Sequence, residues 1–124
     1  MQKNELLINL NYKLSKVDHV KQWHGVITGI NAMRNDGAVS IDIGEGIKVV
    51  AGDAVLKPVS TLIARSEREL FDILLHSQIG DEILFTGTFA KHGGGLVDIS
   101  YTDRGRVGEP EYLFNFVKII KPDK

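Results

Sequence analysis

The chain has 124 residues, which is the size of one domain with one modest hydrophobic core. Hydrophobic residues make up 43% of the sequence and charged residues 25%, values typical of a globular protein. Fifteen basic and sixteen acidic residues give a net charge of -1, so any contact with nucleic acid needs a local basic patch. The sequence contains no cysteine, which excludes disulfides, cysteine-ligated zinc and a thiol nucleophile.

Residues 1–19 predict a short helical appendage, because Leu6, Leu7, Leu10 and Leu14 recur at helical spacing between polar residues. Residues 20–124 are predicted to form the domain itself. No window approaches the roughly 18 apolar residues of a membrane span, so none is expected. As written, the chain is expected in the cytoplasm, or in the periplasm or cell envelope if Met1 replaces a removed leader.

From residue 20 the hydrophobic period changes to two, which predicts strands. Residues 20–33 form a long strand pattern, "RNDG" at 34–37 predicts a hairpin turn, and "AVSIDI" at 38–43 predicts the returning strand. Residues 47–64 predict a third strand that is bulged or broken. Gly52 and Pro58 interrupt this third strand, and the proline favours an edge position.

Residues 66–80, "SERELFDILLHSQIG", predict a capped amphipathic helix. Ser66 and Glu69 match a capping box, in which each side chain accepts a hydrogen bond from a free backbone N–H group of the first turn. Gly80 is expected to end the helix. The expected buried stripe consists of Leu70, Phe71, Leu74 and Leu75.

Residues 80–89, "GDEILFTGTF", predict the next strand, with Gly87 on the same side as Phe85 and Phe89. A glycine at that position relieves crowding in a sharply coiled strand or lets another backbone approach closely. Residues 112–120, "YLFNFVKII", predict the closing strand. We expect the large aromatic side chains to fill the interior of a small barrel, with Trp23 at its end: Phe85, Phe89, Tyr112, Phe114 and Phe116.

Three strands, a helix and a closing pair follow the order of an OB-fold, the five-stranded Greek-key barrel. The chain resembles an OB-fold domain of the bacterial, tRNA-anticodon-binding-like type over roughly residues 20–121. The stretches that carry the resemblance are "WHGVITGI", the helix that leads into "GDEILFTGTF", and "YLFNFVKI". The expected fold is therefore a mainly β barrel of five or six strands, with one helix between the third and fourth strands and an extra N-terminal helix.

The resemblance implies binding of single-stranded DNA or RNA, or of oligosaccharide, on the second and third strands and the flanking loops. Basic or aromatic residues on these elements are the candidate ligand-binding residues, with Tyr101 the aromatic expected to be exposed. Asp98, Asp103, Glu109 and Glu111 offset the basic residues of the long 91–111 connection, and this mixed charge also suits a solvated face. The candidates are Arg34, Lys48, Lys91, His92, Tyr101, Arg104 and Arg106.

Catalytic and cofactor motifs are missing from the sequence. The four histidines form no HExxH pattern, and the glycine clusters at 44–46 and 93–95 lack the Lys-Ser/Thr of a phosphate loop. We therefore expect a non-enzymatic module without metal or cofactor. Single-stranded nucleic acid is the first expected ligand. The near-neutral charge favours the alternative, a module that contacts another protein through an edge strand or the N-terminal helix.

Overall fold

The computed structural model describes residues 19–54, 58–99, 101–102, 105–106 and 110–122. Apart from His19, the predicted N-terminal helix lies outside these residues. Within them, no helix is long and apolar enough to span a bilayer. The elements are β1 (Val20–Ala32), β2 (Asp36–Gly44), β3 (Ile47–Ala51), β4 (Ile63–Ala64), α2 (Arg68–Leu75), β5 (Glu82–Phe89), β6 (Lys91–His92), β7 (Gly95–Leu96), β8 (Tyr101–Thr102), β9 (Gly105–Arg106) and β10 (Glu111–Ile120).

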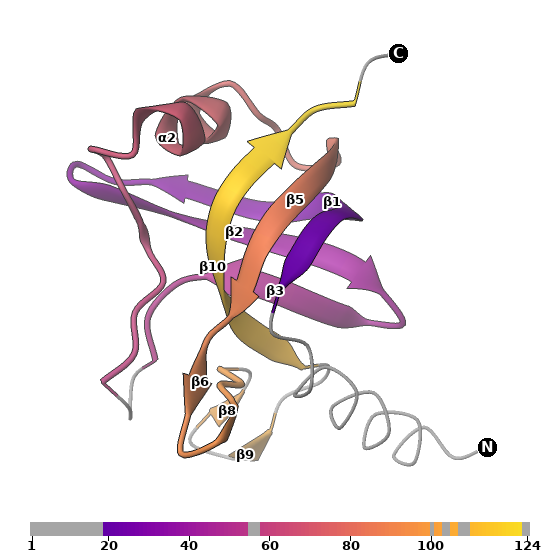
Figure 1. Cartoon of the computed structure of the whole chain (residues 1–124), viewed down its shortest axis with the longest axis vertical. Helices are drawn as coiled ribbons and strands as arrows, with labels where there is room; N and C mark the ends of the chain where they lie inside the picture. Colours follow the sequence, from indigo (N-terminus) through magenta and orange to yellow (C-terminus); the bar gives the residue numbers. More distant parts are fainter. Residues whose placement is uncertain (1–18, 55–57, 100, 103–104, 107–109, 123–124) are drawn as a thin grey trace.

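Five strands close into a barrel in the order β1-β5-β10-β3-β2, and β2 pairs again with β1. The β3–β10 pair is parallel and the other four pairs are antiparallel. The short β4 lies outside the ring and pairs with β2. As Figure 1 shows, α2 lies at one end of the barrel and the β6–β9 hairpins lie at the other. The prediction of a mainly β barrel with one helix between its third and fourth strands is confirmed.

β1 closes the barrel because it changes partner along its length. Its first half pairs with β5 and its second half with β2, and Val26 lies in register with both Glu82 and Asp42. Gly25 stands next to this crossing point. A Cβ there would overlap Ile41 Cγ2 of β2, so the close approach of the two strands requires glycine.

Aromatic rings occupy the barrel interior, as predicted. Phe85 and Phe114 meet edge to face with centroids 5.3 Å apart, and Phe89 and Phe114 do so at 5.1 Å. The half-buried Trp23 packs edge-on against Phe85 and Phe89, so it lines the core without being enclosed by it. These offset contacts suit the quadrupoles of the rings and fix how neighbouring strands pack.

α2 covers the end of the barrel with three of its four predicted stripe residues. Leu70, Phe71 and Leu74 are buried, but Leu75 is 53% exposed. Leu75 is the last residue of the helix and lines an open groove, so the prediction that Leu75 is buried is wrong.

Both predicted ends of the helix are also wrong. The helix begins at Arg68, and Glu67 stands at its N-cap without a side-chain capping hydrogen bond, so Ser66 does not cap it. Gly80 lies beyond the helix in a turn with φ of +98°, and its N–H donates to the Ile27 carbonyl at 2.8 Å. Gly80 therefore ties the turn before β5 to β1 instead of ending α2.

The predicted third strand is broken into two strands. β3 ends at Ala51, an isolated bridge joins Asp53 to Ser60, and β4 follows at Ile63. The buried Thr61 hydroxyl accepts a hydrogen bond from the Gly52 N–H at 3.1 Å. This bond joins the two ends of the segment between β3 and β4. The interruption that Gly52 and Pro58 predict is confirmed.

Gly87 should tolerate no side chain. A Cβ at this position would overlap the Asn115 carbonyl oxygen of β10 and lie 2.7 Å from Phe114 Cε2. We expect Gly87→Ala to lower the free energy of unfolding by about 1 to 3 kcal/mol, with a larger loss for Gly87→Val, because the strands must separate to make room. Urea unfolding measures both values.

Gly95→Ala is the matched control, since nothing lies within 4 Å of its added Cβ. This control should change stability by less than about 0.5 kcal/mol. Equal effects of Gly87→Ala and Gly95→Ala would contradict the close approach of β5 and β10 at Gly87.

Candidate functional site

The candidate residues do not form one patch in the described part of the chain. Arg34 is exposed in the β1–β2 hairpin, Lys48 is half-buried on β3, and Lys91 and His92 are exposed on β6. The β1–β2 hairpin tip and β6 lie at different ends of the barrel (Figure 1). Tyr101 pairs with Arg106 in the β8–β9 ladder. Arg104 lies outside the described residues.

The outer face of β2 and β3, where the resemblance places a ligand, carries alternating charges. Lys48 lies in register with Asp42 of β2 and with Glu111 of β10. Opposite charges on neighbouring strands offset one another across a sheet. Lys48 and its two acidic neighbours therefore do not form a cationic groove of the kind that binds along a phosphate backbone.

Apolar side chains of the chain itself cover part of the same face. Val50 of β3 and Leu113 of β10 are register partners that point away from the barrel core. They form a second buried cluster with Ala90 and Val97, against which Ile99 packs. The sequence pattern shows apolar residues on both sides of these strands, but it does not show what covers them.

Backbone hydrogen bonds hold the covering segment in place. The Leu113 N–H donates to the Val97 carbonyl at 2.9 Å, and the Ile99 N–H donates to the Glu111 carbonyl at 2.8 Å. Residues 97–99 therefore run beside the start of β10. This part of the long 91–111 connection packs on the barrel and helps to close its outer surface.

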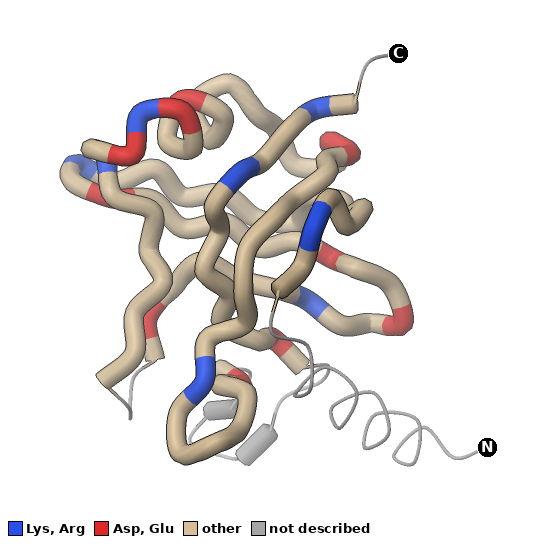
Figure 2. The backbone as a smooth tube through the Cα atoms, in the orientation of Figure 1, with Lys and Arg blue, Asp and Glu red and all other residues tan. Residues whose placement is uncertain are grey.

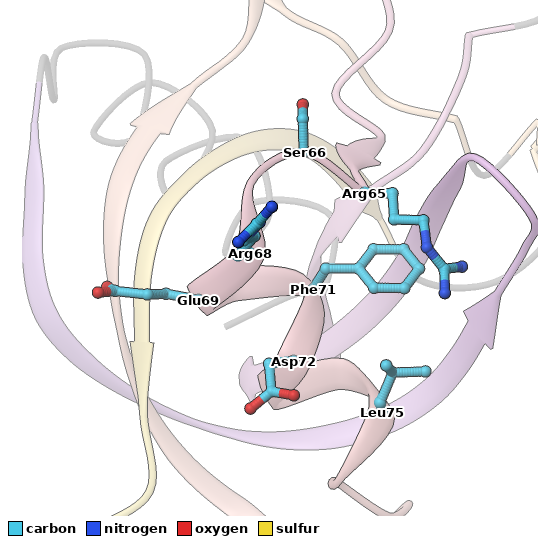
Figure 3. Close-up of a pocket in the computed structure, with 7 residues that line it drawn as sticks. All are labelled: Arg65, Ser66, Arg68, Glu69, Phe71, Asp72 and Leu75. Atoms are coloured by element: carbon cyan, nitrogen blue, oxygen red, sulfur yellow. The ribbon is translucent and has the colours of Figure 1, made fainter.

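Two open grooves flank α2. The larger, of about 710 Å³, is lined on one side by Arg65, Phe71 and Leu75 and on the other by charged helix residues. Figure 3 shows the Arg65 guanidinium beside the Phe71 ring, and the guanidinium carbon lies 5.1 Å from the ring centroid. The smaller groove, of about 270 Å³, lies between the helix and the end of β10, where Val117 is 66% exposed.

Arg65 also connects the helix end of the barrel to the β1–β2 hairpin. Its Nη1 donates to the Arg34 carbonyl at 3.2 Å, and its backbone N–H donates to the Asn35 carbonyl at 3.0 Å. The contact fixes the hairpin backbone that carries Arg34. The sequence places Arg65 directly before the predicted helix but contains no signal for this long-range bond.

A third open groove, of about 450 Å³, crosses β1 and β2 and includes His24, Thr28 and Asp42. The Thr28 hydroxyl donates to Ser40 Oγ at 3.0 Å, so this polar surface is held by bonds within the sheet. The described residues contain no group of three or more metal-binding side chains. They also contain no buried side-chain polar atom without a hydrogen-bond partner.

Arg65→Ala should lower the free energy of unfolding by about 1 kcal/mol, because it removes a cation–π contact and a hydrogen bond to the hairpin. Arg68→Ala is the control, since Arg68 is exposed and lines the same groove. Its effect should stay below about 0.5 kcal/mol. Thermal unfolding of both variants tests this difference, and equal destabilisation would contradict a role for the Arg65 contacts.

No protein-family model, curated protein or solved structure matches the chain. A function for the barrel therefore has to rest on its strand order, surfaces and charges.

Proposed function

We propose that the protein is a non-enzymatic OB-fold module that binds single-stranded nucleic acid. The observation that carries the proposal is the barrel connectivity. β1 pairs with both β2 and β5, and the third barrel strand, β3, runs parallel to the last, β10, with a helix inserted before the fourth. A five-stranded barrel with Greek-key order is the framework on which OB-folds bind oligonucleotides.

Exposed basic residues on the connecting loops support this proposal. Arg34 lies in the connection between the first two barrel strands, and Lys91 and His92 begin the connection between the last two. Those two connections flank the ligand in OB-folds. Because the net charge is -1, binding would depend on such local groups and would weaken steeply with salt.

The resemblance to tRNA-anticodon-binding domains favours RNA over DNA as the proposed ligand. A protein site that contacts 2′-hydroxyl groups binds RNA more tightly than DNA of the same sequence. We therefore expect an RNA oligonucleotide to bind at least as tightly as its DNA counterpart.

A protein-interaction module is the second candidate function. Exposed apolar side chains near α2 favour it, since Leu75 is 53% exposed and Ile79 is 70% exposed. Contiguous apolar surface commonly marks a protein contact. The closed barrel leaves few unpaired strand edges among its described strands, so the predicted edge-strand contact would fall on the two-residue β4.

Fluorescence anisotropy with labelled oligouridylate and oligothymidylate of about 20 nucleotides tests the nucleic-acid proposal. At about 20 mM salt we expect dissociation constants between ~10⁻⁶ and ~10⁻⁴ M, and weaker binding at about 150 mM salt. Duplex DNA of the same length is the control ligand and should bind less tightly.

No binding tighter than about 100 μM at the lower salt would exclude the nucleic-acid proposal. In that case, self-association measured by sedimentation and abolished by Leu75→Glu would favour the second candidate.

A further inference from the structure

Two β-bulges converge on Thr86, in the middle of the outer face formed by β1, β5 and β10. On one side, Val20 pairs with Gly87 and Trp23 with Phe85, so two residues of β1 lie opposite Thr86. On the other side, the register shifts between Phe116 and Lys118 of β10. Both strands that pair with β5 therefore have a β-bulge at the level of Thr86.

Each bulge brings one exposed lysine to the level of Thr86. Lys21 is exposed and lies in the β1 bulge, whereas Lys118 is exposed and in register with Thr86. Bulges commonly re-aim a side chain beside a binding site. Neither lysine forms an ion pair within the described part of the chain, in contrast to Lys121, whose Nζ lies 3.3 Å from Asp81 Oδ2.

The β1 bulge is held by a strained residue and a specific hydrogen bond. Gln22 has φ of +51°, a conformation uncommon for residues other than glycine. Its N–H donates to Thr86 Oγ1 at 3.1 Å. Because the oxygen acts as acceptor in this bond, the hydroxyl hydrogen of Thr86 can still be donated to a ligand.

The strand segments around Thr86 contain basic but no acidic residues, and Glu69 and Asp72 of α2 line the groove next to Lys118. The paired stretches 20–24, 84–88 and 114–120 contain two lysines and no aspartate or glutamate. The nearest acids in these strands lie at the start of β5, where Glu82 faces His24 at 4.0 Å. Figure 2 shows this layer facing the viewer, with basic positions along β10 and β1 and acidic positions at the start of β5 and on α2.

The β2–β3 face differs, because acidic residues lie in register with its lysine. There, Lys48 lies between Asp42 and Glu111, and Val50 is covered by the chain itself. At Thr86, two lysines flank a hydroxyl donor across three neighbouring strands. Adjacent strands lie about 4.8 Å apart, so the three groups span a surface roughly 10 Å wide.

We infer that the phosphate backbone of a single-stranded nucleic acid binds on the outer face of β1, β5 and β10, with Lys21, Thr86 and Lys118 as its ligands. The inference rests on the proposed function and moves the ligand away from the face that the fold implies. The Phe and Tyr side chains of these three strands are buried and Trp23 is half-buried, so these strands offer the bases no exposed Phe, Tyr or Trp ring to stack on, although the His24 imidazole is exposed. Binding at this face is therefore independent of base sequence.

Two double variants of equal charge change test the location. Lys21→Gln/Lys118→Gln removes both lysines beside Thr86, and Arg34→Gln/Lys48→Gln removes two bases from the face and hairpin that the resemblance implies. Each phosphate contact to a single strand contributes about 0.7 to the slope of log K against log salt concentration. We expect the first variant to lose about 1.4 from this slope, equally for oligouridylate, oligothymidylate and oligodeoxyadenylate. The second should lose no more than about 0.7, because Arg34 lies on a connection that flanks the proposed ligand, whereas Lys48 lies between two acidic residues.

Thr86 supplies an independent test that leaves the net charge unchanged. Thr86→Val keeps the branched shape but removes the hydroxyl, whereas Thr86→Ser keeps the hydroxyl. We expect weaker binding for the valine variant and wild-type binding for the serine variant. Thermal unfolding of all four variants checks that each is folded under the assay conditions.

The outcomes separate the inference from the proposed function. Absence of oligonucleotide binding by the wild-type chain overturns both. Binding that is weakened by Arg34→Gln/Lys48→Gln alone, or equally by the two double variants, leaves the proposed function standing and overturns the location at Thr86. Selective loss in Lys21→Gln/Lys118→Gln, accompanied by loss in Thr86→Val, supports it.

Discussion

Closure of the barrel depends on one strand serving two partners. β1 leaves β5 and joins β2 at Val26, which is in register with both strands. The crossing requires β1 and β2 to approach so closely at Gly25 that a Cβ would overlap Ile41. A second close approach, at Gly87, brings β5 against the backbone of β10. The closed ring of five strands around the aromatic core depends on these two close approaches.

The aromatic core limits what the surface can do. Phe85, Phe114 and Phe116 pack against one another with centroids 4.8 to 5.7 Å apart, and Phe89 joins them through Phe114. Rings that stabilise the interior in this way are unavailable as stacking platforms for bases. A nucleic acid bound to this barrel, as proposed, would therefore be recognised mainly through charge and hydrogen bonds on the outer face. This is the physical link between the interior packing and the phosphate site inferred at Thr86.

Local patterns predicted the elements and most of their buried residues. The alternation in the strands, a hairpin between the first two of them and the three leading stripe residues of the helix depend on nearby sequence, and the structure contains them. Only Arg34 and Asn35 of the predicted "RNDG" turn lie between the strands, because Asp36 and Gly37 belong to β2 and Gly37 pairs with Ala32. The helix ends were predicted less well, because Ser66 and Gly80 have the residue types of caps but Glu67 and His76 occupy the cap positions. The Gly80 N–H instead bonds to Ile27 of β1. A sequence motif does not reveal such a distant partner.

Lys21 and Lys118 were not predicted as binding residues, because the bulges that place them beside Thr86 depend on pairing between strands that are distant in the sequence. A weak signal is nevertheless present in the sequence. Val20 and Trp23, which both face the core, are separated by two polar residues where strict alternation allows one. Phe116 and Ile119 are spaced in the same way. Two neighbouring strands that share an irregular spacing at one level indicate a shaped surface, but only their register shows that the two irregularities meet.

The divided pairing of β1 also sets the order in which the barrel can form during synthesis. The second half of β1 can form its hairpin with β2 as soon as residues 36–42 are available. The first half must wait until residues 82–87 of β5 have been made, about half the chain later. Pairings of such long range slow folding. The N-terminal half of β1, with the inferred phosphate-binding Lys21, is thus among the first parts of the barrel to be synthesised and among the last to find its partner.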